Sequence, residues 1–177
     1  LLHKEYDILS KIQHPGVVYV EGIEEVDGYG ECLVQEWIDG VTLDEWLSTP
    51  HTRSQRRQVA HQLLEVMEYV HSQQVVHRDL KLSNIMVTRS GSVVISPEQQ
   101  RGGPTDVRND IYSLGIILDK LQLGLSCRLS IRRCLCPLEA RYPNVAALRH
   151  HILFLHRSLM ALWIVLGVLL VGIAGGA

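Results

Sequence analysis

The sequence has 177 residues and a formal net charge of −2 at pH 7. This length corresponds to one domain, and the lack of a basic excess argues against nucleic acid as a partner. Four unevenly spaced cysteines argue against a disulfide framework. A Zn²⁺ site is an alternative use of such side chains, although the spacing of its candidate ligands is unusual: Cys134, Cys136, His150 and His151.

The first part of the chain combines one predicted helix with two predicted strands. Residues 1–13 place apolar side chains three and four positions apart, which predicts an amphipathic helix. Pro15 ends that helix, because proline disfavours the helical conformation in the residue before it. Residues 17–25 and 31–36 are predicted to form two β-strands, joined by a turn over residues 27–30.

The middle of the chain is mainly helical. Asp39-Gly40 ends the strand pattern, and Thr42 is the expected N-cap of a short helix that runs to Leu47. A longer helix is predicted over residues 54–71, and residues 85–87 and 92–95 are predicted to form a β-hairpin. The long helix is expected to bury one apolar face, made of Val59, Leu63, Val66, Met67 and Val70.

The last part of the chain contains three predicted helices and a long apolar segment. The helices cover residues 110–121, 126–136 and 141–152. Residues 158–177 carry no charge and are long enough for a helix to cross a hydrocarbon core of about 30 Å. We expect a transmembrane helix there rather than a buried helix of a soluble core, because the segment has no polar face.

The charges around the apolar segment predict its orientation. Basic residues precede it and none follows it, so the positive-inside rule places residues 1–157 in the cytoplasm as part of a single-pass membrane protein. Gly172 and Gly176 form a small-xxx-small pair, which favours a homodimer through the membrane helix. The basic residues before the segment are Arg149, His150, His151, His156 and Arg157.

The most informative motif lies between the long helix and the hairpin. Residues 77–84, His-Arg-Asp-Leu-Lys-Leu-Ser-Asn, match the pattern H-R-D-L-x-x-x-N, and the sequence therefore resembles the protein kinase superfamily. The resemblance implies phosphoryl transfer from ATP with Mg²⁺ as cofactor. In that reaction Asp79 would accept the proton of a substrate hydroxyl, Lys81 would contact the transferred phosphate and Asn84 would bind Mg²⁺. Lys81 at this position is typical of the serine/threonine-directed branch.

Landmarks of a nucleotide site accompany this motif in the order that the family has them. Glu5 resembles the glutamate of the regulatory C helix, which pairs with a strand-three lysine in the family. Gln35 lies at the gatekeeper position, and the backbone of Glu36 and Ile38 would meet the adenine edge. Met86 would lie under the adenine ring. The resemblance thus implies that ATP would bind between the residues around Glu36 and the hairpin.

A second group of landmarks has structural roles in the family. Residues 96–98, Ser-Pro-Glu, and the segment that begins at Asp110 are similar to the A-P-E and F-helix motifs of bacterial serine/threonine kinases. Asp110 would then accept N–H bonds from the backbone of residues 77–84. Arg141 lies where the family has the arginine that pairs with the A-P-E glutamate, here Glu98.

The sequence also departs from the family. It contains no glycine-rich loop and no strand-three lysine to pair with Glu5, and Pro97 stands where the family has the Asp-Phe-Gly aspartate that binds Mg²⁺. The activation segment is missing too, so Arg78 has no phosphorylated loop to dock, and His77 is expected to be structural. One lost electrostatic contact in an active site costs a factor of about 10²–10³, so we expect little or no activity from these residues alone.

The sequence therefore predicts a mixed α+β fold like that of a protein kinase. Residues 1–36 would be a partial N-lobe, with one helix and two strands, and residues 37–157 a mostly α-helical C-lobe. Residues 158–177 would be the membrane helix. Because two strands alone are marginally stable in water, residues 1–36 are expected to be poorly ordered in isolation.

The expected function is ATP-dependent phosphorylation of serine or threonine on proteins, in signalling at a membrane. The partner would be a protein substrate or another signalling protein. Two alternatives remain open: a membrane-tethered pseudokinase that binds proteins without catalysis, and a purely structural membrane anchor. The sequence does not separate a piece of a larger kinase from a degenerate relative or a faulty gene model.

Overall fold

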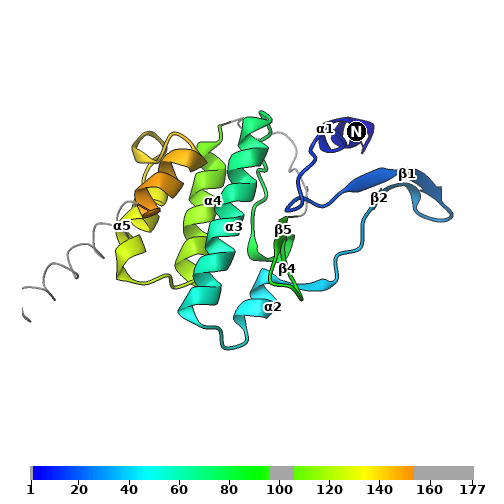
Figure 1. The fold of residues 1–177 in the computed structure, drawn as a ribbon. Coiled ribbons are helices and arrows are strands. Elements are labelled where there is room, and N and C mark those ends of the chain that lie inside the picture. Colours follow the sequence, from blue (N-terminus) through cyan, green and yellow to red (C-terminus); the bar gives the residue numbers. More distant parts are fainter. Residues whose placement is uncertain (1, 96–105, 154–177) are drawn as a thin grey trace, which may run out of the picture.

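The computed structural model describes residues 2–95 and 106–153, which form a mixed α+β fold. Glu98 and residues 158–177, in which the sequence predicts a membrane helix, lie outside these ranges. Within the two ranges, no helix is both long enough and apolar enough to cross a bilayer. Three helices gather on one side of the molecule (Figure 1): α3 (Arg53–Ser72), α4 (Arg108–Lys120) and α5 (Leu125–Cys134).

The N-terminal part consists of one helix and an antiparallel ribbon that extends away from the other helices (Figure 1). The two predicted strands are confirmed as β1 (Val20–Val26) and β2 (Gly30–Gln35), which pair with Ile23 opposite Leu33. Helix α1 (Leu2–Leu9) is shorter than the helix predicted over residues 1–13. The chain turns after Leu9, which places Ile12 in the core at 5% exposure.

A second sheet has three strands, one more than the sequence predicts. The expected hairpin is confirmed as β4 (Ile85–Thr88) and β5 (Val93–Ile95). A third strand, β3 (Gly40–Thr42), pairs antiparallel with β4, although Gly40 was expected to end the strand pattern. Glycine permits this pairing because a Cβ atom at position 40 would lie 2.6 Å from the carbonyl oxygen of Val87.

The N-terminal part is joined to this sheet by the segment between α1 and β1. The N–H of Ile95 donates to the carbonyl oxygen of Gly16 at 2.9 Å, and the N–H of Val18 donates to the carbonyl oxygen of Ile95 at 3.1 Å. Val17 consequently forms a parallel bridge with Ile95. The segment lies close to α3 as well, since a Cβ atom at Gly16 would overlap Val66.

Helices α2 (Leu43–Leu47) and α3 follow the sequence prediction closely. In α2 the N–H of Thr42 donates to the Glu45 carboxylate at 3.3 Å. In α3 the N–H of Gln55 donates to the Thr52 hydroxyl at 3.2 Å, so Thr52 caps the helix. The predicted apolar face of α3 is confirmed, because all five of its members are buried: Val59, Leu63, Val66, Met67 and Val70.

The C-terminal helices pack closely against one another. The approach of α4 to α5 depends on Gly115, where a Cβ atom would lie 2.6 Å from Cβ of Cys134. The helix predicted over residues 141–152 was predicted to start too early. Residues 141–144 are not helical, and the helix runs from residue 145 to at least residue 153. The helix starts there because Asn144 caps it: the Asn144 side chain accepts a hydrogen bond from the N–H of Ala147 at 2.8 Å.

Candidate functional site

The motif of residues 77–84 lies in the connection from α3 to β4. We call it the 77–84 loop. It ends in a single 3₁₀ turn, η1 (Leu82–Asn84), from which the chain enters β4 directly. His77, Leu80 and Asn84 are buried at 2%, 5% and 6% exposure, so the loop is built into the core by three of its eight side chains.

Asp79 is at the centre of the polar contacts in the 77–84 loop. Lys81 Nζ donates to Asp79 Oδ2 at 2.6 Å, and Asn84 Nδ2 donates to the same oxygen at 3.1 Å. Asn84 Nδ2 also donates to the backbone carbonyl of Asp79 at 3.0 Å. The hydrogen bond from Lys81 lowers the pKa of the Asp79 carboxyl, and Asn84 acts in the same direction, so Asp79 is a carboxylate at neutral pH.

The 77–84 loop is fixed to α4 by Asp110. The backbone N–H of His77 donates to Asp110 Oδ2 and that of Arg78 to Asp110 Oδ1, both at 2.8 Å. His71, near the end of α3, places its Nε2 2.8 Å from Oδ2 as well. Burial raises the pKa of Asp110, but hydrogen bonds from His71 and from the two backbone groups outweigh it, and the pKa lies below its usual value.

Arg78 has a backbone conformation that few residues adopt. Its φ angle is +67°, in the left-handed region, and it is not a glycine. A non-glycine residue in this region costs about 1–3 kcal/mol and persists only where its surroundings impose the conformation. Here the bond from the N–H of Arg78 to Asp110 supplies that restraint. The conformation of the loop is thus imposed by α4, through Asp110, and not by the backbone preference of Arg78.

The residues expected to bind the nucleotide lie on neighbouring elements. Glu36 and Ile38 are in the segment between β2 and β3, and Met86 is in β4 opposite Thr42 of β3. The N–H of Glu36 donates to the carbonyl of Tyr19 at 2.9 Å, and the N–H of Tyr19 donates to the Glu36 carboxylate at 2.7 Å. These bonds join the segment to the residue that precedes β1.

The described residues do not fit a complete Mg²⁺–ATP site. Mg²⁺ in such sites is bound by one or two carboxylates together with the phosphates. In the described parts of the chain no three His, Cys, Asp or Glu side chains are arranged to hold a metal ion, and the Asp79 carboxylate is ion-paired with Lys81. The sequence has a single phenylalanine, Phe154, so no Asp-Phe-Gly triplet occurs in it.

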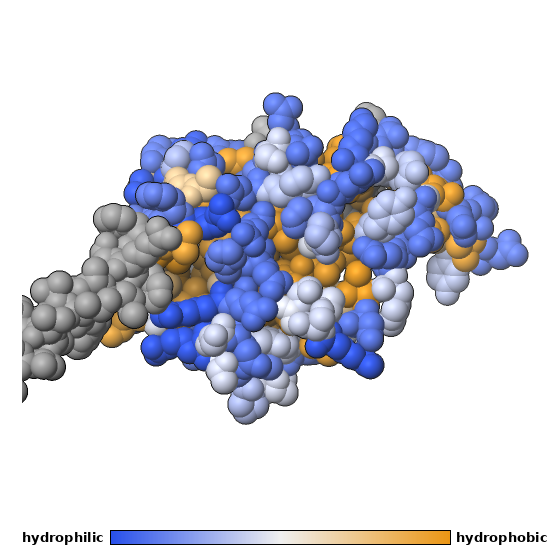
Figure 2. Space-filling view, in the orientation of Figure 1, coloured by the Kyte–Doolittle hydropathy of each residue, from blue (hydrophilic) through white to orange (hydrophobic). Residues whose placement is uncertain are grey.

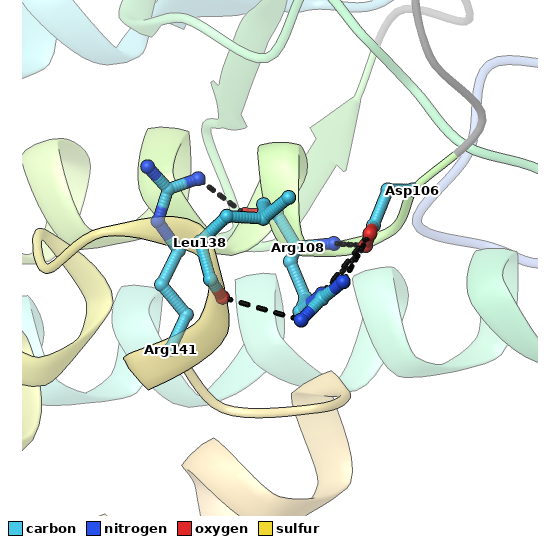
Figure 3. A network of polar contacts seen from close by, with 4 residues as sticks. All are labelled: Asp106, Arg108, Leu138 and Arg141. Atoms are coloured by element: carbon cyan, nitrogen blue, oxygen red, sulfur yellow. Dashed lines mark hydrogen bonds and ion pairs between the residues drawn. The ribbon is translucent and has the colours of Figure 1, made fainter.

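A network at the start of α4 was not predicted from the sequence (Figure 3). Arg108 binds the Asp106 carboxylate, with Nη2 2.6 Å from Oδ2, and donates through Nη1 to the carbonyl of Leu138 at 3.3 Å. Arg141 Nη1 donates to the carbonyl of Arg108 at 3.1 Å. The network joins α4 to the turn η2 (Leu138–Ala140). Asp106 and Arg108 could not be identified from the sequence because a pair two positions apart has no distinctive pattern.

One expected ion pair, and the expected role of Glu5, depend on side chains that the structure does not describe. Arg141 was expected to pair with Glu98, which is not among the described residues. Arg141 instead shows a bond from Nε to the carbonyl of Cys136 at 2.8 Å, and its guanidinium lies 4.7 Å from the ring centre of Tyr112. Glu5 is in α1, but its side chain is not described. The pair of Arg141 with Glu98 and the resemblance of Glu5 to the C-helix glutamate therefore stay predictions.

Comparison with known proteins gives a consistent family. The family model for the protein kinase domain matches residues 1–96, a stretch that ends directly after β5. A probable serine/threonine-protein kinase PknB of Lactococcus lactis is 28% identical over 150 residues, which cover 68% of this chain and 24% of that protein.

Two further relatives have similar names and similar coverage. The serine/threonine-protein kinase PrkC of Bacillus subtilis is 28% identical over 151 residues, with 68% of this chain and 23% of that protein covered. The serine/threonine-protein kinase PknB of Mycobacterium tuberculosis is 27% identical over 155 residues, with 68% and 25% covered. The chain thus spans about a quarter of the length of these relatives.

Proposed function

This chain belongs to the protein kinase family, and we propose that it carries the catalytic-loop part of a serine/threonine protein kinase anchored in a membrane through residues 158–177. The observation that supports the activity is the hydrogen-bonded set of Asp79, Lys81 and Asn84, in a loop that Asp110 holds in shape. The uncharged segment 158–177 and the basic residues before it support the anchor and a cytoplasmic position of residues 1–157.

The three side chains would act on a protein hydroxyl in different ways. Asp79, ionised at neutral pH, would accept a hydrogen bond from a serine or threonine hydroxyl and then its proton. Lys81 would offer its positive charge to an anion next to that hydroxyl, since its side chain is half exposed. Asn84 would hold Asp79 in place through its Nδ2 bonds to the carboxylate and to the backbone, and its side-chain oxygen would be a ligand for Mg²⁺.

Residues 1–177 as a separate chain would transfer phosphate slowly or not at all. Kinases rely on positioning and on positive charge around the phosphates, mostly from metal ions and a strand-three lysine. The sequence has no Asp-Phe-Gly triplet for the metal, and Lys81 is paired with Asp79. The same observation favours a second candidate, a non-catalytic module that binds a signalling protein at the membrane.

Nucleotide binding separates the two candidates. The full chain in detergent micelles is heated with MgCl₂ alone, ATP alone or both, and its melting temperature is recorded. A ligand at 100 times its Kd stabilises the folded state by about 2.7 kcal/mol, which such a scan detects. A shift that needs both Mg²⁺ and ATP, and that Asn84→Ala removes while Asp119→Ala keeps, supports the kinase.

A folded chain without any such shift contradicts nucleotide binding and leaves the non-catalytic module. Asp79→Asn distinguishes binding from catalysis, because it keeps the shape of the side chain but removes the base. For the kinase, this variant is expected to retain the shift and to lose any phosphorylation of a serine-containing protein substrate.

A further inference from the structure

We propose that one face of helix α5 lies on the surface of an anionic phospholipid membrane. The face is formed by Leu125, Arg128, Leu129 and Arg132, and we call it the α5 outer face. The proposal rests on the membrane-anchoring part of the proposed function and adds a second contact between the folded part and the bilayer.

The α5 outer face exposes apolar side chains to solvent. Leu125 is 79% exposed and Leu129 is 65% exposed, although both are leucines in a helix that packs on the core. The four members lie at positions i, i+3, i+4 and i+7, so they share one side of the helix. In Figure 2, apolar and strongly hydrophilic surfaces lie side by side at the end of the molecule that carries α5.

The opposite face of α5 supplies the packing. Cys127, Ser130, Ile131 and Cys134 repeat with the same spacing, and all four are buried. Ser130 is fully buried, and its hydroxyl lies 2.9 Å from Nδ1 of His151. The fold therefore uses one side of α5 only, and the two exposed leucines do not contribute to the core.

The charge of α5 matches an anionic surface. The helix contains three arginines and no acidic residue. Arg133 is engaged with its own fold, with its guanidinium 4.5 Å from the ring centre of Tyr142. Arg128 and Arg132 form no ion pair with other residues in the described parts of the chain and are exposed. Binding of a helix at a membrane interface grows with the apolar area that it buries and with its electrostatic attraction to anionic lipids, and this face offers two leucines and two arginines.

The position of α5 brings it within reach of the expected bilayer. His151, bonded to Ser130, lies in the last described helix, which therefore packs directly against α5. Leu153 is the last described residue, and the uncharged segment begins at Ser158. Five residues span at most about 17 Å even when fully extended. A chain that enters the membrane at residue 158 thus keeps α5 near the headgroups.

These observations favour lipid over a second protein. A protein partner would have to cover two leucines while it pairs two arginines, and nothing about the face specifies such a shape. Lipid phosphates supply negative charge without a fixed geometry, and each arginine near an anionic surface strengthens binding by roughly fivefold. Contact with a second copy of this chain is kept as an outcome of the test.

Photo-crosslinking of the full chain in lipid nanodiscs tests the contact. Leu129 is replaced by p-benzoylphenylalanine, and the discs contain phosphatidylcholine with or without phosphatidylglycerol. Adducts are identified by intact-protein mass spectrometry. The expected result is a phosphatidylglycerol adduct, and Arg128→Gln with Arg132→Gln should reduce its yield by about tenfold or more. The matched control, Lys11→Gln with Arg89→Gln, removes two exposed charges elsewhere and should leave the yield unchanged.

The position of the crosslinker has its own control. The same amino acid at Tyr29, which is 84% exposed at the tip of the β1–β2 ribbon, is expected to form no lipid adduct. Equal adducts at both positions, no adduct at position 129, or an adduct that the arginine variants leave intact would each overturn the proposal. A crosslinked protein dimer in place of a lipid adduct would assign the face to a second copy.

The test is independent of nucleotide binding and reports separately on the anchor. Extraction with alkaline carbonate shows whether residues 158–177 hold the chain in the disc. If they do not, the same variants are incubated with vesicles of the two compositions, and the α5 outer face must then bind phosphatidylglycerol vesicles by itself. An extractable chain that also fails to crosslink in anionic vesicles overturns the inference.

Discussion

The imidazole of His71 donates a hydrogen bond of 2.8 Å to the carboxylate of Asp110, and this contact joins the end of α3 to the start of α4. Both side chains are almost fully buried, at 7% and 1% exposure. A carboxylate with a lowered pKa can only accept, so Nε2 of His71 carries the proton. The 77–84 loop is therefore fixed by a side chain from each of two helices.

Replacing Asp110 should strongly destabilise the fold. Asp110→Ala leaves the N–H groups of His77 and Arg78 and the imidazole of His71 without their acceptor inside the protein. A buried group left without its hydrogen-bond partner costs about 1–3 kcal/mol, and we expect a loss of at least this size in urea unfolding. Asp119→Ala, in the exposed part of the same helix, is the matched control and should change stability by less than about 0.5 kcal/mol.

The same carboxylate predicts a dependence of stability on pH. Because its pKa is below the ordinary value of 3.8 in the folded state, the ionised group stabilises the fold above pH 3.8, and this contribution is lost as the pH falls further. Urea unfolding of wild type at pH 5 and pH 3 should show the loss. The difference should be smaller in Asp110→Ala, and an equal acid sensitivity of both proteins would contradict the assignment.

Lys81 should control the ionisation of Asp79. Its hydrogen bond is the largest cause of the lowered pKa, so Lys81→Met should raise the pKa of the Asp79 carboxyl toward 3.8 or above. The carboxyl carbon of Asp79 can be followed by NMR during a pH titration of both proteins. Lys120→Met, an exposed lysine of α4, serves as control and should leave the midpoint in place. If Lys81→Met leaves the titration midpoint of Asp79 unchanged, Lys81 does not control the ionisation of Asp79.

Features with a local pattern could be predicted from the sequence. The apolar period over residues 54–71 identified α3 and its buried face, and two short apolar runs on either side of Arg89-Ser90-Gly91 identified the β4–β5 hairpin. The 77–84 loop could be identified because its functional residues lie within eight consecutive positions that match one motif. Asp79 and Asn84 lie close together because only a single turn separates them.

Features that depend on distant residues could not be predicted. His71 is one of two histidines in an amphipathic helix, and its partner lies 39 positions later. Strand β3 has three residues, too few for an alternating pattern, and becomes a strand only because β4 offers its edge. The start of the last helix was placed too early because the apolar period continues through Tyr142, whereas Asn144 caps the helix two residues later.

Gly115 should be sensitive to the smallest enlargement. Gly115→Ala places a methyl group 2.6 Å from Cβ of Cys134, so α4 and α5 must move apart. Overpacking of this kind costs about 1–3 kcal/mol, measurable by urea unfolding. Gly22→Ala is the control, because nothing lies within 4 Å of a Cβ atom there. If Gly115→Ala is as stable as wild type, the two helices are less closely packed than the structure indicates.

Cys134 should be unreactive in the folded protein. Burial raises the pKa of its thiol to about 12, and the thiolate is the nucleophile in alkylation. At pH 8 we expect iodoacetamide to modify Cys134 about 10³-fold more slowly than a thiol of pKa 8.5. Peptide mass spectrometry gives the rates for all four cysteines, and the partly exposed Cys136 is an internal reference. Comparable rates for Cys134 and Cys136 would show that α5 opens readily.

The bridge between Gly16 and Ile95 has a consequence for the order of folding. Its two backbones are 79 positions apart, whereas α3 and the β4–β5 hairpin are built from contacts between near neighbours. Closing so long a loop is entropically slow, and local contacts form first. Substitution of Val17 by Ala should therefore mainly accelerate unfolding in stopped-flow experiments, whereas Leu63→Ala should mainly slow refolding. On this account, the N-terminal part attaches last, to a helical core that has already formed.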